Sequence, residues 1–299
     1  MATLKETRTR IVSIRNTSKI TQAMRMVAAA KLRRAQDAIT AARPYANQLQ
    51  KILSNLAASE TDFVHPYFES RENLQNVMII VVSSDRGLCG GFNANLLRAT
   101  RERIAKLQAE YSGVKVTVIP VGRRSVNAFR KRSEEILKEF PDVFLKLDFS
   151  TALEIAELAS DAFLAHRADR VEIMHSEFVS VIRQDVQALQ LLPIAPTAAD
   201  ERNADTDGHG SAVDYIFEPT RADILDALLP QYLNMQVWKA LLDSNAAEQA
   251  ARMMAMENAT NNARDLISSL QLIYNRERQA AITKEMLEIV GGAEALSAS

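Results

Sequence analysis

The sequence predicts an α/β domain with an open, mostly parallel sheet, joined to a long antiparallel coiled coil that the N- and C-terminal helices form. Two observations carry this prediction: the distribution of glycine and proline, and a heptad pattern near the N-terminus. Seven of the nine glycines and seven of the eight prolines lie between Pro66 and Pro230. Because these residues mark turns, we expect a folded mixed domain between two long helices. The expected boundaries are 1–65, 66–219 and 220–299.

Apolar residues recur along the N-terminal segment at helical spacing. Steps of three and four residues reach fourteen positions, and eleven of them are apolar, which indicates a heptad seam. Pro44 is expected to bend this helix, because the seam resumes in phase after it. The seam positions are Ile11, Ile14, Ser18, Thr21, Arg25, Ala28, Leu32, Ala35, Ile39, Ala42, Ala46, Leu49, Leu53 and Leu56.

The C-terminal segment also predicts a long helix. Residues 231–290 contain neither glycine nor proline, and as a helix they would span roughly 90 Å. Thr220 is the expected N-cap, with Asp223 completing a capping box, and Gly291-Gly292 is expected to loosen or end the helix. A bundle folded back on itself is the alternative, but it requires turn signals inside this stretch. Two apolar stripes on different faces are expected: Met256, Ala259, Ala263, Leu266, Leu270 and Ile273, then Ile282, Met286, Ile289, Ala293 and Leu296.

The middle of the chain alternates between strand and helix patterns, which predicts a small Rossmann-like layer fold. Residues 197–212 are rich in Asp, Asn and Gly and are expected to form a surface loop. The expected elements are a strand at 77–82, a helix at 94–111, a strand at 114–121, a basic helix through Lys138, a helix at 151–166, and strands near 171–179 and 181–189.

Composition excludes several classes of function. The net charge is −1, so the whole chain gives no hint of a nucleic-acid or membrane partner, and no apolar run of 18 residues predicts a membrane span. Cys89 is the only cysteine, which rules out an internal disulfide and a cysteine-based metal site. The four histidines are scattered and no G-x-S-x-G motif is present, so we expect no catalytic site, metal or cofactor.

The loop Ser83–Asn93 lies where α/β proteins bind phosphates, between a strand and a helix. It matches neither G-x-G-x-x-G nor the P-loop pattern, and no Lys-Ser/Thr pair follows its glycines. A tight structural turn is therefore favoured over a nucleotide site. Cys89 beside Asp85 and Arg86 could be a reactive thiol, but nothing nearby in the sequence would orient a general base.

Residues 1–34 carry nine Lys and Arg against one acid, Glu6. A solvated helix face, a mitochondrial presequence and a nucleic-acid contact are three interpretations. The heptad pattern continues through this region, so nothing marks a removable leader. Ile20, Met24 and Val27 add apolar residues to faces other than the seam. A helix that is apolar on several sides and basic between them favours enclosure by an acidic protein partner.

Three motifs together resemble the gamma-subunit family of bacterial F-type ATP synthases. The first is the run IRNTSKITQAMRMVAAAK, residues 14–31, and the second is the loop DRGLCGGFN, residues 85–93. The third comprises AARMMAMENAT, residues 250–260, and ITKEMLEIVGGAEA, residues 282–295. The motifs occur in the family's order and cover essentially the whole chain.

This resemblance implies a central rotor shaft without catalytic activity. The terminal helices would lie inside a ring of three alpha and three beta subunits, with the α/β domain as a foot against epsilon and the membrane c-ring. Delta would be a partner only through the complex, with one copy of this chain in each. Chloroplast members carry a regulatory cysteine pair before the last helix, whereas residues 197–214 here contain none. With no transit peptide recognised, we expect a peripheral protein on the cytoplasmic face of a bacterial inner membrane.

The resemblance also implies particular site residues. Met24 and Arg25 would face an acidic segment of beta, and four residues of the last helix would contact or support its catch region: Arg252, Gln279, Thr283 and Glu285. Their plainer interpretation is that of exposed polar residues on a long helix. The loop would be a feature of the foot on the epsilon and c-ring side, and its expected residues are Arg86, Gly87, Cys89, Gly90, Gly91 and Asn93.

Two other functions remain as alternatives from the residues alone. One is a nucleotide-binding α/β protein with a coiled-coil adaptor arm. The other is a helical nucleic-acid adaptor that uses the basic N-terminus, which would bind DNA with a steep salt dependence.

Overall fold

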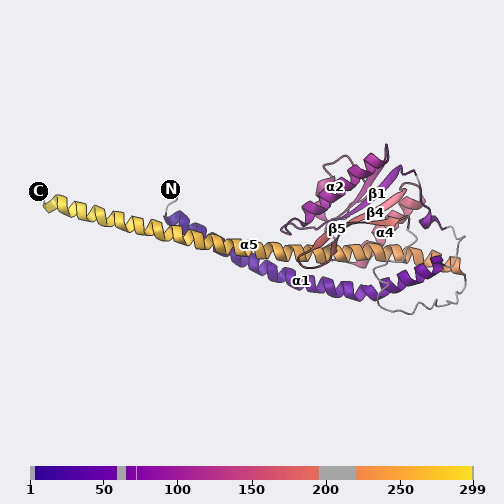
Figure 1. The fold of residues 1–299 in the computed structure, drawn as a ribbon, viewed down its shortest axis with the longest axis horizontal. Coiled ribbons are helices and arrows are strands. Elements are labelled where there is room, and N and C mark those ends of the chain that lie inside the picture. Colours follow the sequence, from indigo (N-terminus) through magenta and orange to yellow (C-terminus); the bar gives the residue numbers. More distant parts are fainter. Residues whose placement is uncertain (1–3, 59–64, 72, 195–219, 298–299) are drawn as a thin grey trace. The chain divides into compact units, whose positions relative to one another are not determined.

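The computed structural model describes residues 4–58, 65–71, 73–194 and 220–297 (Figure 1). The chain divides into two compact units. One unit comprises the two chain ends, up to Ala29 and from Arg252, and the other spans Ala30–Ala251. The sequence-based boundaries at 65 and 219 follow the change from helix to mixed structure and stay predictions. The expected loop at 197–212, and the cysteine-free region up to residue 214, lie outside the described residues.

The larger unit contains a five-stranded sheet in the order β3-β2-β1-β4-β5. Four strands run parallel to one another: β1 (Asn76–Val82), β2 (Lys115–Val121), β3 (Glu135–Ile136) and β4 (Arg170–Phe178). The edge strand β5 (Gln184–Leu192) is antiparallel to β4. In β1 every residue from Val77 to Val82 is buried, as expected for a central parallel strand covered on both faces. The predicted open, mostly parallel sheet is confirmed.

Helices cover both faces of this sheet (Figure 1). On one face the core includes apolar residues of α4 (Phe149–Leu164) and of the first part of α5 (Arg221–Ser297), from Leu225 to Leu241. On the other face α2 (Phe92–Glu110) contributes Leu96, Ile104 and Leu107, and α3 (Arg123–Phe129) contributes Phe129. A 3-10 turn, η1 (Pro66–Phe68), precedes the sheet.

The predicted helices at the two chain ends are confirmed. α1 (Leu4–Ala58) has 55 residues and runs through Pro44 without interruption, and α5 has 77 residues with no turn inside it. Thr220 begins α5 as predicted, because its Oγ1 accepts a hydrogen bond from the Asp223 amide at 3.2 Å and donates to the Asp223 carboxylate at 2.6 Å. From Ile11 to Leu53, every residue of the predicted α1 seam is buried or half-buried.

Within the unit of the two chain ends, α1 and α5 pair antiparallel. Thr7 donates a hydrogen bond to Glu277 at 3.2 Å, and Arg25 lies 3.4 Å from Glu257. The hydroxyls of Thr21 and Thr260 are 2.7 Å apart and buried. Each step forward along α1 is therefore matched by a step backward along α5, as in an antiparallel coiled coil.

The predicted α5 stripe was partly wrong. Met256, Ala263 and Leu270 are buried as expected, but Leu266 and Ile273 are 42% and 48% exposed. Their neighbours Ile267 and Tyr274 are half-buried instead. In both places two adjacent residues are apolar, and the packing against α1 selects the second one.

Two expected boundaries in the sheet domain were also wrong. The basic helix does not reach Lys138: α3 ends at Phe129, and residues 135–136 pair with the edge of β2, where the Leu137 amide donates to the Val118 carbonyl at 3.1 Å. The last strand starts at Gln184 rather than 181, because Ser180–Arg183 form the hairpin turn. In both cases backbone pairing in the folded sheet overrides local side-chain preference.

Gly291 and Gly292 do not end α5, which continues to Ser297. A Cβ atom at either position would meet nothing within 4 Å. Because glycine costs about 1 kcal/mol relative to alanine inside a helix, we expect the double substitution G291A/G292A to increase helical content, measured by far-ultraviolet circular dichroism. Ala280→Gly, at another exposed α5 position, should lower it. Unchanged helicity in the double variant would contradict the helical assignment of this end.

Candidate functional site

The end of α5 extends past the start of α1 within their unit (Figure 1). Because Thr7 lies opposite Glu277, Leu4 lies opposite about residue 280 in this register. From there to Ser297, no described residue of α1 faces α5. The change of stripe predicted from the sequence therefore coincides with the point where the coiled coil becomes a single helix.

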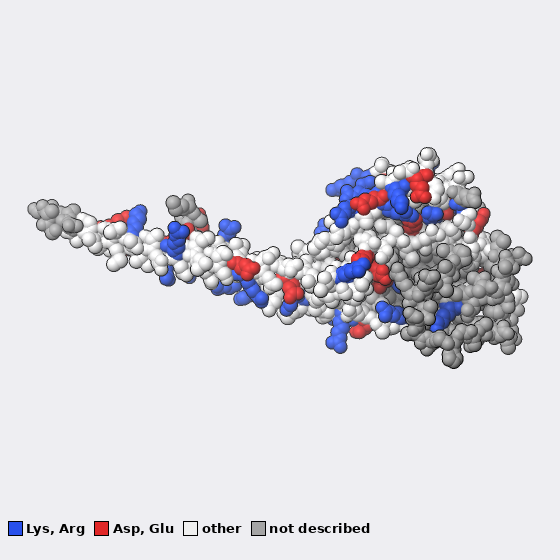
Figure 2. All heavy atoms as spheres, in the orientation of Figure 1, with Lys and Arg blue, Asp and Glu red and all other residues white. Residues whose placement is uncertain are grey.

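This single helix exposes an apolar surface. From residue 281 to 293 every residue of α5 is exposed, and the large apolar side chains among them are 50–67% exposed. Figure 2 shows the same end of α5 mostly in white, and the charged residues between 281 and 293 are Lys284, Glu285 and Glu288. We call this set the apolar end: Ile282, Met286, Leu287, Ile289 and Val290.

The paired part of the same unit also exposes apolar side chains away from the α1–α5 seam. Ile20 is 60% exposed and Leu272 is 73% exposed. An exposed apolar side chain is ordinary when it occurs alone, but a run along one element marks an interaction site. The others in this unit are Val12, Met26, Val27, Leu266 and Ile273.

The polar residues predicted at this unit lie along both helices. Met24 and Arg25 of α1 are half-buried, and Arg25 forms an ion pair with Glu257 in which both side chains are about 40% exposed. Arg252 is half-buried, whereas Gln279, Thr283 and Glu285 are exposed on α5. Thr283 Oγ1 donates to the Gln279 carbonyl at 3.0 Å, so these two residues share one face. The sequence analysis did not single out Leu272 or Leu287, each of which lies directly beside a residue of the predicted stripes, Ile273 or Met286.

The glycine loop between β1 and α2 is a structured turn. Asn93 Oδ1 accepts a hydrogen bond from the Ser84 amide at 3.1 Å, and Asn93 Nδ2 donates to Cys89 Sγ at 3.1 Å, which fastens the loop to the end of β1. Gly90 has a φ of 57°. Gly87 lies against Arg124, and Gly91 precedes α2 as its N-cap.

Cys89 anchors this loop inside the larger unit. Its side chain is 2% exposed and packs with Phe92 and with Ala247 of α5, next to the partly buried Phe178 and Ala251. The loop is therefore part of the contact between the sheet domain and α5. A reactive role for the Cys89 thiol does not fit this burial.

An acidic side chain occupies the place where a nucleotide-binding fold would hold phosphate. Asp85 Oδ1 accepts hydrogen bonds from the amides of Arg123 at 2.9 Å and Asp142 at 2.8 Å, and Oδ2 accepts one from the Phe144 amide at 2.7 Å. These amides lie beyond the carboxyl ends of β1 and β2. A carboxylate there both uses donors that an anion would need and repels the anion, which argues against a nucleotide site.

A polar cavity of about 290 Å³ lies between α1, β4 and α5 in the larger unit. Arg43, Glu177, Lys239 and Asp243 are the charged residues among those that line it. Burial raises the pKa of Asp243 to about 6, against the opposing effect of nearby Lys239. Burial also lowers the pKa of His175 on β4 to about 4, so this imidazole is neutral at pH 7.

The sequence matches the ATP synthase family over residues 3–296. The ATP synthase gamma chain of Chlorobaculum parvum is 48% identical over 297 residues, which cover 99% of each chain. The ATP synthase gamma chain of Chloroherpeton thalassium is 46% identical over 303 residues, covering all of both chains.

The chain belongs to the ATP synthase gamma-chain family. Solved structures agree with this assignment. A chain from the central stalk and c-ring of the Tetrahymena thermophila mitochondrial ATP synthase is 25% identical with a TM-score of 0.58, covering 80% of this chain and 99% of that one. A chain from the OSCP/F1/c-ring structure of the Euglena gracilis mitochondrial ATP synthase shares the fold, with a TM-score of 0.68 at 20% identity, covering 99% and 95%.

The predicted gamma-subunit resemblance, and with it the role of a central-shaft subunit of ATP synthase, is confirmed at the level of the family. No helix in the described part of the gamma-family chain is long and apolar enough to cross a membrane. Among the same residues, no three His, Cys, Asp or Glu side chains are placed to hold a metal ion together.

Proposed function

We propose that this chain is the central rotor shaft of a proton-translocating F-type ATP synthase and carries no catalytic site of its own. The nucleotide chemistry would take place at the alpha/beta interfaces of the surrounding subunits. Family membership supports this proposal. So does Asp85, whose carboxylate places a negative charge in the loop that resembles a phosphate-binding turn.

The observation that carries the proposal is the apolar end of α5. Five large apolar side chains, each at least half exposed, follow one another where α5 has no helical partner among the described residues. Leaving them in water is unfavourable by about 25 cal/mol for each Å² of apolar surface. A sleeve of surrounding alpha and beta subunits would cover this surface and still let the helix turn, because apolar contacts are non-directional.

The polar residues of the same unit would then transmit force. Met24 and Arg25 would face an acidic segment of beta. Four residues of α5 would contact or support its catch region: Arg252, Gln279, Thr283 and Glu285. An asymmetric shaft would favour a different conformation in each beta subunit as it turns, so rotation is converted to differences in conformational free energy.

The sheet domain would form the foot of the shaft. It would lie against epsilon and the c-ring, with the loop from Arg86 to Asn93 on that side. Delta would belong to the complex without being required for this contact, and each complex would hold one copy of this chain. Association with the cytoplasmic face of a bacterial inner membrane would be peripheral, through the complex only.

Reconstitution with alpha and beta subunits tests the role, and charge reversal tests the contacts. The chain alone should hydrolyse no ATP and should change the hydrolysis rate of an alpha/beta mixture. Arg25→Glu replaces a largely exposed ion pair with Glu257 by two neighbouring carboxylates, and because exposed pairs are worth only about 0.2–1 kcal/mol, thermal stability should fall slightly. Proton pumping per ATP hydrolysed should nevertheless fall several-fold in membrane vesicles, and Arg252→Glu should behave alike.

Lys146→Glu reverses an exposed charge in the sheet domain and serves as the matched control, with unchanged coupling. Equal losses of thermal stability and of coupling in the two arginine variants would contradict their contact role. A chain that neither joins the alpha/beta assembly nor alters its hydrolysis would contradict the shaft itself.

A further inference from the structure

Helix α2 lines two cavities of the sheet domain, and neither cavity has a residue of the apolar end or of the glycine loop in its lining. One cavity of about 430 Å³ lies between α2, β2 and the segment around β3, and one of about 310 Å³ lies between α2 and α3. Arg101 and Arg132 line both cavities. We call this pair of cavities the α2–α3 cleft.

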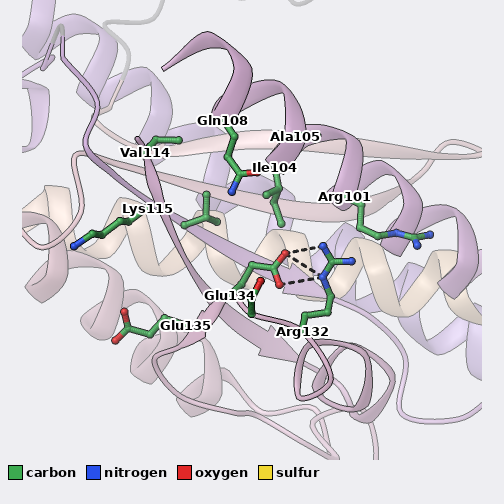
Figure 3. A pocket seen from close by; sticks show the side chains of 11 residues that line it. Arg101, Ile104, Ala105, Gln108, Val114, Lys115, Arg132, Glu134 and Glu135 are labelled. Atoms are coloured by element: carbon green, nitrogen blue, oxygen red, sulfur yellow. Dashed lines mark hydrogen bonds and ion pairs between the residues drawn. The ribbon is translucent and has the colours of Figure 1, made fainter. Parts of the chain in front are cut away.

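The floor of the cleft is apolar. In the smaller cavity the lining consists of Ala94, Leu97, Ala128 and Phe129 together with the two arginines. In the larger cavity Ile104 and Gln108 of α2 point toward the space, and Arg132 and Glu134 close the opposite side (Figure 3). Such a floor, at the bottom of a polar rim, accepts one apolar side chain of a partner.

The rim is strongly basic. From Phe92 to Glu135, the range that includes the residues lining both cavities, the sequence has ten Lys and Arg against four acids, Glu102, Glu110, Glu134 and Glu135. Figure 2 shows blue side chains gathered over α2 and the neighbouring segments. Because potentials of opposite sign attract over a surface, this rim selects a partner with carboxylates.

Not all of this charge is neutralised within the domain. Arg103 pairs with the buried Glu172, and Arg130 pairs with Glu139. Arg132 donates hydrogen bonds of 2.7–3.0 Å to Glu134. In the described part of the chain, the hydrogen bond found for exposed Arg101 goes to the Leu97 carbonyl of its own helix, at 3.1 Å. Arg124 and Lys131 lie four residues before and three residues after the cavity residue Ala128, and neither forms an ion pair among the described residues, so three guanidinium or ammonium groups remain for a partner.

We propose that the α2–α3 cleft docks an acidic segment of another protein, which inserts one apolar side chain between α2 and α3 and places carboxylates on Arg101, Arg124 and Lys131. Nucleic acid fits less well. Phe129, the aromatic residue of the cleft, is 1% exposed and offers no surface for base stacking.

Synthetic peptides test this proposal on the full-length chain. A fluorescently labelled acidic peptide with one central leucine should bind saturably, and the same peptide with serine in place of leucine should bind at least fivefold more weakly. Arg101→Glu should lower the affinity of the leucine peptide at least tenfold, since it replaces an attraction by a repulsion. Arg101→Gln, which is milder for folding, should lower it about threefold.

Arg167→Glu is the matched control, because it reverses another exposed charge, beyond the end of α4, and should change the affinity less than twofold. Thermal unfolding identical to that of the native chain establishes that each variant is folded. Four outcomes would overturn the proposal: no saturable binding, equal affinity for the serine peptide, an equal loss with Arg167→Glu, or equally effective competition by oligothymidylate or by phosphatidylserine vesicles.

Discussion

Replacing Gly122 by alanine is expected to lower the free energy of unfolding of the sheet domain by about 4 kcal/mol. Gly122 follows β2 with a φ of 88°, a conformation that residues with a Cβ atom rarely adopt and that costs them about 1–3 kcal/mol. A Cβ atom there would also lie 2.1 Å from the carbonyl oxygen of Ser83. Because that oxygen belongs to the backbone at the end of β1, it cannot move without separating the two strands.

The turn that begins at Gly122 also forms two other hydrogen bonds. The Gly122 amide donates to the Phe140 carbonyl at 2.8 Å, and the Ser125 amide donates to Ser83 Oγ at 2.7 Å. Chemical denaturation at 25 °C measures the loss. Gly113→Ala is the matched control, since Gly113 also has a positive φ, 80°, but a Cβ atom there meets nothing within 4 Å. The control should cost about 1 kcal/mol, and equal losses at the two glycines would contradict the close approach to Ser83.

The main elements of the fold could be predicted because each depends on a pattern local in the sequence. The six buried residues of β1 form a continuous apolar run, which is typical of a strand covered on both faces. The α1 seam repeats often enough that Ser18, Thr21 and Arg25 do not obscure it. The long α5 follows from the absence of glycine and proline between residues 231 and 290.

The errors arose where the choice depends on distant residues. Periodicity cannot choose between Leu266 and Ile267, since both are apolar and adjacent, and the packing against α1 decides. The end of α3 and the short β3 depend on β2, whose Val118 carbonyl accepts a bond from Leu137. The local sequence from Arg130 to Lys138 favours a helix, and it does not indicate that residues 135–136 pair with the edge of β2.

The site was predicted by resemblance more than by pattern. The positions of Arg25 and Arg252 on the helices follow from the motifs, but their exposure depends on how α1 and α5 pair. The role of Asp85 was missed because its partners, the amides of Asp142 and Phe144, are 57 and 59 residues away in the chain. The apolar end was recognised as a change of stripe, and only the α1–α5 register explains why it is exposed.

The second large expected effect is a change in the pH dependence of stability when the buried Asp243 is replaced. Asp243 is 8% exposed on α5, and the charged groups that face it are Lys239 on its own helix, Glu177 on β4 and Arg43 on α1. Burial raises the pKa of Asp243 from 3.8 in the unfolded chain to about 6 in the folded one. The folded protein therefore binds more protons between these values, and the contribution of this group to stability falls as the pH rises from about 4 to 6.

A pKa difference of about two pH units corresponds to about 3 kcal/mol at neutral pH. We therefore expect Asp243→Asn to raise the free energy of unfolding at pH 7.5 by up to that amount, and to have little effect near pH 4, measured by denaturation across the pH range. Asp161→Asn, at an exposed position of α4, should leave the profile unchanged. If Asp243→Asn instead lowers the free energy of unfolding at pH 7.5, favourable contacts of the carboxylate outweigh the cost of burying it.

The contribution of His175 to stability is expected to change with pH in the opposite direction to that of Asp243, over almost the same pH range. Burial lowers its pKa from 6.5 to about 4, and its Nδ1 has no hydrogen-bond partner among the described residues. The unfolded chain binds the additional proton here, so the contribution of His175 to stability falls as the pH drops from 6.5 to 4. The opposite pH dependences that Asp243 and His175 give to the stability of the native chain therefore largely cancel. Asp243→Asn should expose the slope due to His175, with stability decreasing toward acid, whereas His175→Gln should expose the slope due to Asp243, with stability decreasing toward neutral pH.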